Sequence, residues 1–223
     1  MQTVTRIVAI RHGETAWNVD TRLQGHLDVP LNATGRWQAE RLAQALIDEG
    51  ISAVYSSDLS RALETADALG RALDLGVVTD SRLRERAFGS FEALTFAQIE
   101  CRWPAQARRW VQREPDFAPE GGESLTIFYA RCIDAVRRLA AAHTGETIAV
   151  VAHGGVMDCL YRAATRLDLQ AQRSWTLGNA SINRLLYTPQ GFTLIGWSDT
   201  WHLEDDSLDE TSDGETGVER AGR

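Results

Sequence analysis

Lysine is absent from this sequence, and all 23 of its basic residues are arginines. The absence excludes a phosphate-binding loop that depends on lysine, and it also excludes a Schiff base on a lysine amine. Cysteine is scarce, and Cys101, Cys132 and Cys159 stand far apart with no C-x-x-C pair. This spacing is typical of neither a disulfide framework nor a zinc site, so we expect no metal and no cofactor.

Long apolar runs are missing as well. No stretch approaches the roughly 20 residues that a membrane-spanning helix needs. The apolar run near the N-terminus is too short for a secretory signal, because Arg6 and Arg11 flank it. We therefore expect a cytoplasmic protein with no membrane partner.

Negative charge is concentrated at the C-terminal end. Of the formal net charge of −8, residues 203–223 carry −6, from eight acidic residues and two arginines. We expect this segment to be a flexible acidic tail. Residues 1–202 are nearly neutral, so a nucleic-acid partner is not indicated. Their length is typical of one domain with one packed core.

The hydrophobic pattern alternates between short apolar strands and amphipathic helices. We expect helix 35–49 to begin at Thr34 as N-cap, and its Trp37 to face the core. Alternating elements predict an α/β fold, a three-layer sandwich whose largely parallel sheet has helices on both faces and one antiparallel element. The expected strands are 6–10, 52–56, 77–79, 147–152, 181–188 and 191–197, the expected helices are 35–49, 59–73, 124–143 and 156–165, and 88–123 is expected to be irregular.

Charged and imidazole side chains follow the expected strands, where ligands of open α/β sheets bind. Arg11 and His12 end the first strand, and His153 ends the strand 147–152. Arg61 lies one turn into the helix after strand 52–56, and Glu85 follows the short third strand. Arginine forks match phosphate oxygens, a neutral histidine among cations can attack phosphorus, and a carboxylic acid can protonate the leaving oxygen. The set predicts phosphoryl transfer through a phosphohistidine.

Five short motifs in order carry a family resemblance. RHGETAWN, RLQGHLDVPLNATG, YSSDLSRALETA, LRE and VVAHGG resemble the histidine phosphatase superfamily, the cofactor-dependent phosphoglycerate mutase-like proteins. The resemblance implies that His12 is the phosphorylated nucleophile and that Glu85 donates and accepts the proton. It further implies that the phosphoryl group is held by Arg11, Arg61 and His153, and that the substrate is contacted by Asn18, Gln24, Gly25 and Gly154.

Two departures from the family pattern bear on function. Ala93 stands where the family has a glycine, which predicts a differently shaped loop. The segment 88–123 is short for a dedicated mutase, which favours a metal-independent phosphatase of small phosphorylated substrates. Phosphoglycerate mutase is the alternative, and a non-catalytic phosphate-binding regulatory protein is the lesser one. The sequence does not identify the substrate.

Several residues have a structural interpretation beside the functional one. Arg84 and Arg86 are expected to be structural or peripheral, His26 to be an ordinary surface histidine, and His202 to be incidental. Trp103, Trp110 and Phe117 could form either a lid over the substrate or a small core beneath a long loop. The last strand has an exposed face that could pair in a homodimer.

Overall fold

The computed structural model describes residues 4–204, which fold around a single six-stranded sheet. The strand order is β3-β2-β4-β1-β5-β6. The first four strands of that order run parallel, whereas β5 is antiparallel to β1 and β6 is antiparallel to β5. The strands are β1 Thr5–Arg11, β2 Ile51–Ser56, β3 Val77–Thr79, β4 Thr147–Ala152, β5 Ile182–Thr188 and β6 Gly191–Asp199. The predicted α/β sandwich is confirmed.

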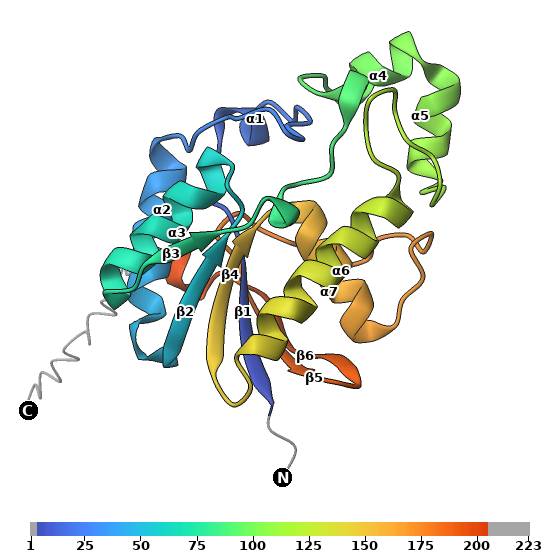
Figure 1. Cartoon of the computed structure of the whole chain (residues 1–223). Coiled ribbons are helices and arrows are strands. Elements are labelled where there is room, and N and C mark those ends of the chain that lie inside the picture. Colours follow the sequence, from blue (N-terminus) through green and yellow to red (C-terminus); the bar gives the residue numbers. More distant parts are fainter. Residues whose placement is uncertain (1–3, 205–223) are drawn as a thin grey trace, which may run out of the picture.

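Helices cover both faces of the sheet, with α2 and α3 on one side and α6 and α7 on the other (Figure 1). The helices are α1 Ala16–Val19, α2 Ala33–Ala45, α3 Ser60–Leu73, α4 Phe96–Arg102, α5 Pro104–Val111, α6 Leu125–Ala142 and α7 Gly154–Thr165. Short 3-10 turns occupy Ile47–Glu49, Ser81–Leu83, Gly89–Phe91 and Trp201–Leu203. None of the helices in the described range is long and apolar enough to cross a membrane.

The central strand β1 contributes to two cores at once. Ile7 and Ala9 belong to the core beneath α6 and α7, and Val8 and Ile10 belong to the core beneath α2 and α3. This follows from the alternation of side chains along a strand. Because both faces of the strand are covered, its residues 7–10 form a continuous apolar run, which ends at the polar residues Arg11 and His12.

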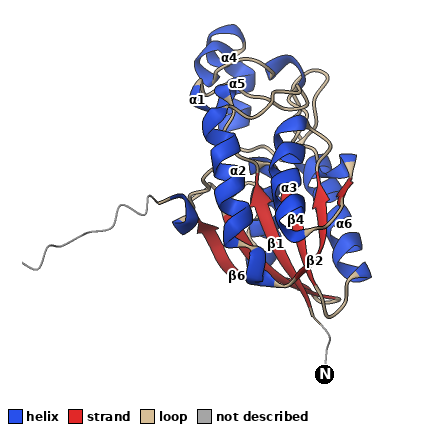
Figure 2. Ribbon diagram, turned by 90° about the vertical axis from the view of Figure 1, so that its left-hand side faces the viewer, coloured by secondary structure: helices blue, strands red, loops and turns tan. Residues whose placement is uncertain are grey.

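The segment 88–123, expected to be irregular, contains the two helices α4 and α5. Thr95 begins α4 with a capping box, and Pro104 occupies the first turn of α5, where its missing N–H costs nothing. We call this segment the cap, and it lies beyond the carboxyl ends of the strands (Figure 2). It has a small core of its own, made of Phe91, Ile99, Ala107 and Phe117 with Trp103 and Trp110 packed against it.

Two details at α2 differ from expectation. Asn32 is the N-cap in place of Thr34, because its side chain accepts a hydrogen bond from the N–H of Gly35. Trp37 does not face the core and is 44% exposed. The predicted face was wrong because the buried stripe follows Ala39, Leu42 and Ala43 instead.

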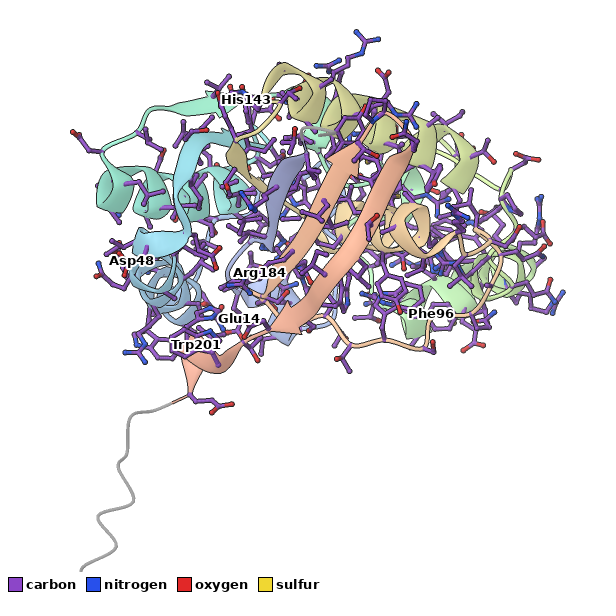
Figure 3. The ribbon with its side chains drawn as sticks, turned by 90° about the horizontal axis from the view of Figure 1, so that it is seen from below. Glu14, Asp48, Phe96, His143, Arg184 and Trp201 are labelled. Carbon is purple, nitrogen blue, oxygen red and sulfur yellow. The ribbon has the colours of Figure 1, made fainter. Side chains whose placement is uncertain are left out.

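The antiparallel hairpin β5–β6 forms one end of the sheet. Arg184 on β5, labelled in Figure 3, pairs with Glu49 and Asp199 and so ties the hairpin to the 3-10 turn after α2. His202 was expected to be incidental but is buried, and its Nε2 lies 3.1 Å from the carbonyl oxygen of Ala180. Apart from Leu203 and Glu204, the acidic tail lies outside the described residues.

Candidate active site

The carboxyl ends of β1, β2 and β4 bring the predicted residues to one cavity of about 220 Å³. Arg11 and His12 come from the end of β1, Arg61 from the first turn of α3, and Glu85 from the segment after β3. The cavity is lined by Arg11, His12, Asn18, Arg22, Leu23, Gln24, Gly25, Arg61, Glu85, Phe88, Gly154, Gly155 and Arg173. His153 stands behind His12, with the two ring centroids 5.2 Å apart and the rings edge to face.

Hydrogen bonding fixes which nitrogen of His12 is reactive. Its Nδ1 lies 2.6 Å from the carbonyl oxygen of Gly13. A carbonyl only accepts hydrogen bonds, so Nδ1 carries the proton and Nε2 keeps its lone pair. The imidazole is 3% exposed, which holds this orientation in place.

The surroundings keep His12 neutral. Burial lowers its pKa well below 6.5, and the positive charges of Arg61 and Arg11 lower it further, against the opposite effect of the Gly13 carbonyl. Burial and the charge of Arg61 lower the pKa of His153 in the same way. Both rings are therefore uncharged near neutral pH, and His12 is a base and a nucleophile there.

Ser57 contacts the ring of His153. The Oγ of Ser57 accepts from the N–H of Leu59 at 3.3 Å and lies 2.8 Å from Nε2 of His153. When the hydroxyl donates to Nε2, the ring proton of His153 lies on Nδ1. That buried Nδ1 has no hydrogen-bond partner within the described residues.

Arg11 and Arg61 are held by backbone carbonyls. Arg11 donates from Nη1 to Leu177 at 2.7 Å, and Arg61 donates to Leu27 at 2.9 Å and to Gly25 at 2.8 Å. The Nε of each is buried and lacks a partner in residues 4–204. Burial lowers the pKa of Arg11 to about 10, so it stays charged at neutral pH. The two guanidiniums are thus fixed cations with unused donors.

Glu85 is positioned by two backbone amides. Its Oε2 accepts from the N–H of Gly155 at 2.9 Å and its Oε1 accepts from the N–H of Arg86 at 2.8 Å. The first N–H belongs to the start of α7, so the N-terminal turn of this helix holds the carboxylate. The backbone carbonyl of Glu85 lies 2.8 Å from Nε2 of His26, so this histidine supports the site.

The predicted substrate-side residues all line the cavity. Asn18 accepts through Oδ1 from Asn179 at 3.2 Å, which leaves its amide nitrogen for a ligand. Gln24 is 7% exposed, and its Oε1 has no partner in the described chain. Gly25 has a φ of 53°, and a Cβ there would meet the Glu92 side chain, so the turn requires glycine.

Three further charged residues near the site are Arg84, Arg86 and Glu14. Arg84 is structural, with a bidentate pair to Asp58. Arg86 is 5% exposed and donates to the carbonyls of Glu123 and Phe117 beneath the cap. Glu14, labelled in Figure 3, accepts from Asn32 at 2.7 Å and does not line the cavity.

Ala93 stands in a loop that contacts the cavity residues Arg22 and Leu23. Ala93 has a φ of 66°, the left-handed conformation that a glycine adopts readily. Its N–H donates to the carbonyl of Leu23 at 2.8 Å, and its own carbonyl accepts from Arg22 at 2.9 Å. The loop therefore keeps a glycine-type backbone and supports the cavity wall.

Ser57 and Arg173 also belong to the site, although the sequence did not predict them. Ser57 carried a signal, because it directly follows the strand that leads to Arg61. Arg173 lies in the loop between α7 and β5, where no motif or periodicity marks it.

Comparisons with known proteins identify the family of the chain. The family model described as the histidine phosphatase superfamily (branch 1) matches residues 7–200. The chain is 42% identical to phosphoglycerate mutase-like protein 4 of Arabidopsis thaliana, across 89% of this chain and 87% of that protein. It is 37% identical to the metal-independent phosphoserine phosphatase of the same plant, across 90% and 84%. The structure of a mycobacterial glucosyl-3-phosphoglycerate phosphatase superposes with a TM-score of 0.77 at 36% identity, across 86% and 98%.

Proposed function

The chain belongs to the histidine phosphatase superfamily, and from that premise we propose that it hydrolyses small phosphorylated metabolites through a phosphohistidine at His12, without a metal ion. One observation carries the proposal. Three buried nitrogens have no partner in the described chain, Nε of Arg11, Nε of Arg61 and Nδ1 of His153, and they belong to residues that line the cavity with His12 or contact its ring. Buried donors of this kind are costly unless an acceptor meets them, and a phosphoryl group offers three oxygens.

The first step transfers the phosphoryl group to the enzyme. Nε2 of His12 attacks phosphorus, a nitrogen–phosphorus bond forms, and the bond to the ester oxygen breaks. Glu85 gives its proton to that oxygen, so that a neutral alcohol leaves. The arginines stabilise the charge that spreads over the phosphoryl oxygens in the transition state.

The second step returns the enzyme to its starting form. Glu85, now a carboxylate, takes a proton from water, whose oxygen attacks phosphorus. The nitrogen–phosphorus bond of His12 breaks, and inorganic phosphate leaves. The amide of Gly155 holds the carboxylate of Glu85 in one position. There it serves the ester oxygen in the first step and the oxygen of water in the second.

Two of the relatives are named as phosphatases, and the short cap favours the same outcome. A mutase must keep water from the phosphohistidine, and the cap of residues 88–123 is a small unit with its own core. The name of the 42% identical plant relative supports phosphoglycerate mutase as the second candidate. There the bound alcohol, in place of water, takes the phosphoryl group back on another oxygen.

The test offers the protein 3-phosphoglycerate with a trace of 2,3-bisphosphoglycerate, and separately a panel of phosphomonoesters. We expect free phosphate from several members of the panel and little 2-phosphoglycerate. Rapid interconversion of the phosphoglycerates with almost no free phosphate would establish the mutase instead.

A second measurement tests the intermediate. Rapid quenching with labelled substrate should trap acid-labile, base-stable phosphate on the wild-type enzyme and none on His12→Ala. Vanadate should inhibit, since it mimics the five-coordinate phosphoryl group, and EDTA should not. Full activity of His12→Ala, or a loss in EDTA that a divalent ion restores, contradicts the mechanism.

A further inference from the structure

The loop between α7 and β5 places Arg173 at the junction of two cavities. One is the catalytic cavity, and the other is an adjoining cavity of about 160 Å³. Both are lined by Glu85, Phe88, Gly154, Gly155 and Arg173. A substrate whose phosphate reaches His12 would extend past Arg173 into the second cavity.

Arg173 differs from the two arginines that flank His12. Its guanidinium donates no hydrogen bond within residues 4–204, whereas Arg11 and Arg61 are each held by carbonyls. The nearest carboxylate oxygen is Oδ1 of Asp158, 4.0 Å from Nε of Arg173 and beyond hydrogen-bond distance. The five donors of this fork are therefore available to a ligand.

The carboxylate of Asp158 is already used by two other arginines. Its Oδ2 accepts from Nη2 of Arg113 at 2.9 Å and from Nε of Arg162 at 2.9 Å. Three arginines thus share one carboxylate, and Glu85, the other acid on the wall, is held by backbone amides. Among the described residues, this corner of the site therefore has more positive than negative charge.

The pairs around Asp158 also fix the loop that carries Arg173. Arg113, which follows α5 within the cap, donates from Nε to the carbonyl of Leu169 at 2.9 Å. Trp175, two residues after Arg173, stacks on Tyr161 of α7 with ring centroids 3.9 Å apart. The loop is anchored on both sides of Arg173, which places this residue at the junction of the two cavities.

We propose that Arg173 binds a second anionic group of the substrate, so that the enzyme prefers phosphomonoesters that also carry a carboxylate or a second phosphate. This specificity rests on the proposed phosphatase function. The guanidinium fork matches either anion in two-point contact. The organic part of the substrate would lie against the apolar wall of the second cavity, formed by Phe88, Trp110, Leu125, Phe128 and Leu169.

The experiment compares substrates that differ only in the second anion. The carboxylate pair is 3-phosphoglycerate and glycerol 3-phosphate, and the phosphate pair is fructose 1,6-bisphosphate and fructose 6-phosphate. We expect wild-type kcat/KM to favour the more anionic member of at least one pair. Arg173→Gln should reduce that preference roughly 10- to 100-fold, the usual effect of losing a hydrogen bond to a charged group.

Two further variants separate binding from structure. Arg173→Lys keeps the charge and should restore part of the preference. Arg108→Gln removes the same charge from an exposed position on α5 and should leave the preference unchanged. An equal loss on both members of each pair, or no change in the ratio, overturns the proposal.

A binding measurement keeps this result apart from the phosphatase function. Calorimetry on the His12→Ala protein compares 3-phosphoglycerate with glycerol 3-phosphate, and fructose 1,6-bisphosphate with fructose 6-phosphate. Tighter binding of the more anionic ligand in a pair, lost on adding Arg173→Gln, supports the subsite even if the wild-type enzyme turns over no substrate. Equal binding within both pairs refutes the subsite. The proposed phosphatase function would still stand in that case if the wild-type enzyme releases phosphate from p-nitrophenyl phosphate.

Discussion

The N–H of Gly155 donates to Oε2 of Glu85 at 2.9 Å, and a Cβ on residue 155 would lie 2.1 Å from Oε1 of the same carboxylate. The glycine thus both holds the carboxylate and leaves room for it. Because Oε1 also accepts from Arg86, the carboxylate cannot move aside without losing a hydrogen bond. The first turn of α7 is shaped around one side chain.

Gly155→Ala is expected to displace Glu85 and to lower kcat for alkyl phosphates about 100-fold or more, within the range of lost general acid catalysis. Stopped assays of phosphate release measure the effect. Gly76→Ala is the matched control, because a Cβ at residue 76 meets nothing within 4 Å. Wild-type activity of Gly155→Ala would show that the carboxylate position is not critical.

Glu85→Gln should cost far more with alkyl phosphates than with p-nitrophenyl phosphate. An alkoxide needs a proton to leave, whereas nitrophenolate leaves without one, so we expect a loss of about 10²–10⁴-fold for the alkyl esters alone. Steady-state kcat for the two substrate types gives the comparison. Equal losses would assign the acid role elsewhere, although Glu14, the other acid of the RHGE motif, is bonded to Asn32.

Acid should destabilise the fold through its buried histidines. Burial lowers the pKa of His12, His153 and His202 below 6.5, so the folded state does not take up protons that the unfolded state binds. Stability is complete above pH 6.5 and falls as the pH drops below it, by up to about 1.4 kcal/mol per pH unit for each histidine. Urea unfolding at pH 7.5, 6.5 and 5.5 measures this.

The matched variant for that experiment is His153→Asn, which removes one of the three histidines. The free energy of unfolding should then change less steeply with pH, by the contribution of one proton. A free energy of unfolding that is flat from pH 7.5 to 5.5 would mean that these rings are protonated in the folded protein.

Ala93→Gly should stabilise the protein by about 0.5–1 kcal/mol, since a left-handed backbone strains any residue with a Cβ and the gain outweighs the entropy that glycine loses. The midpoint of urea unfolding measures the change. Ala130→Gly, at an exposed position in α6, is the control of opposite sign and should lose about 1 kcal/mol. Destabilisation by both variants would show that Ala93 is not strained.

The sequence predicts which residues meet at the cavity because several of them lie at the ends of buried strands. Arg11 ends one apolar run and His153 follows another, and parallel strands align their carboxyl ends. The predicted bounds of β3 and β4 are correct to the residue. Both are short runs rich in β-branched residues, and a polar residue or a glycine stands directly before and after each run.

Prediction fails where contacts that are distant in the sequence decide the conformation. The sequence of the cap predicts irregular structure because Pro104 and its neighbours break the helical pattern. In the structure Pro104 starts helix α5, and Phe91 belongs to the core of the cap. Arg173 lies in a loop whose course is set by Arg113 and Trp175, and neither contact leaves a periodic trace in the sequence.

The separate core of the cap has a consequence for how the molecule opens. Strand β1 is bonded on both sides, to β4 and to β5, so the amides of Ile7–Arg11 can exchange with solvent only when the whole sheet comes apart. The cap rests on its own aromatic cluster and can loosen without disturbing those bonds. Amide exchange should therefore be slowest in the strand that leads to His12 and faster across residues 96–111.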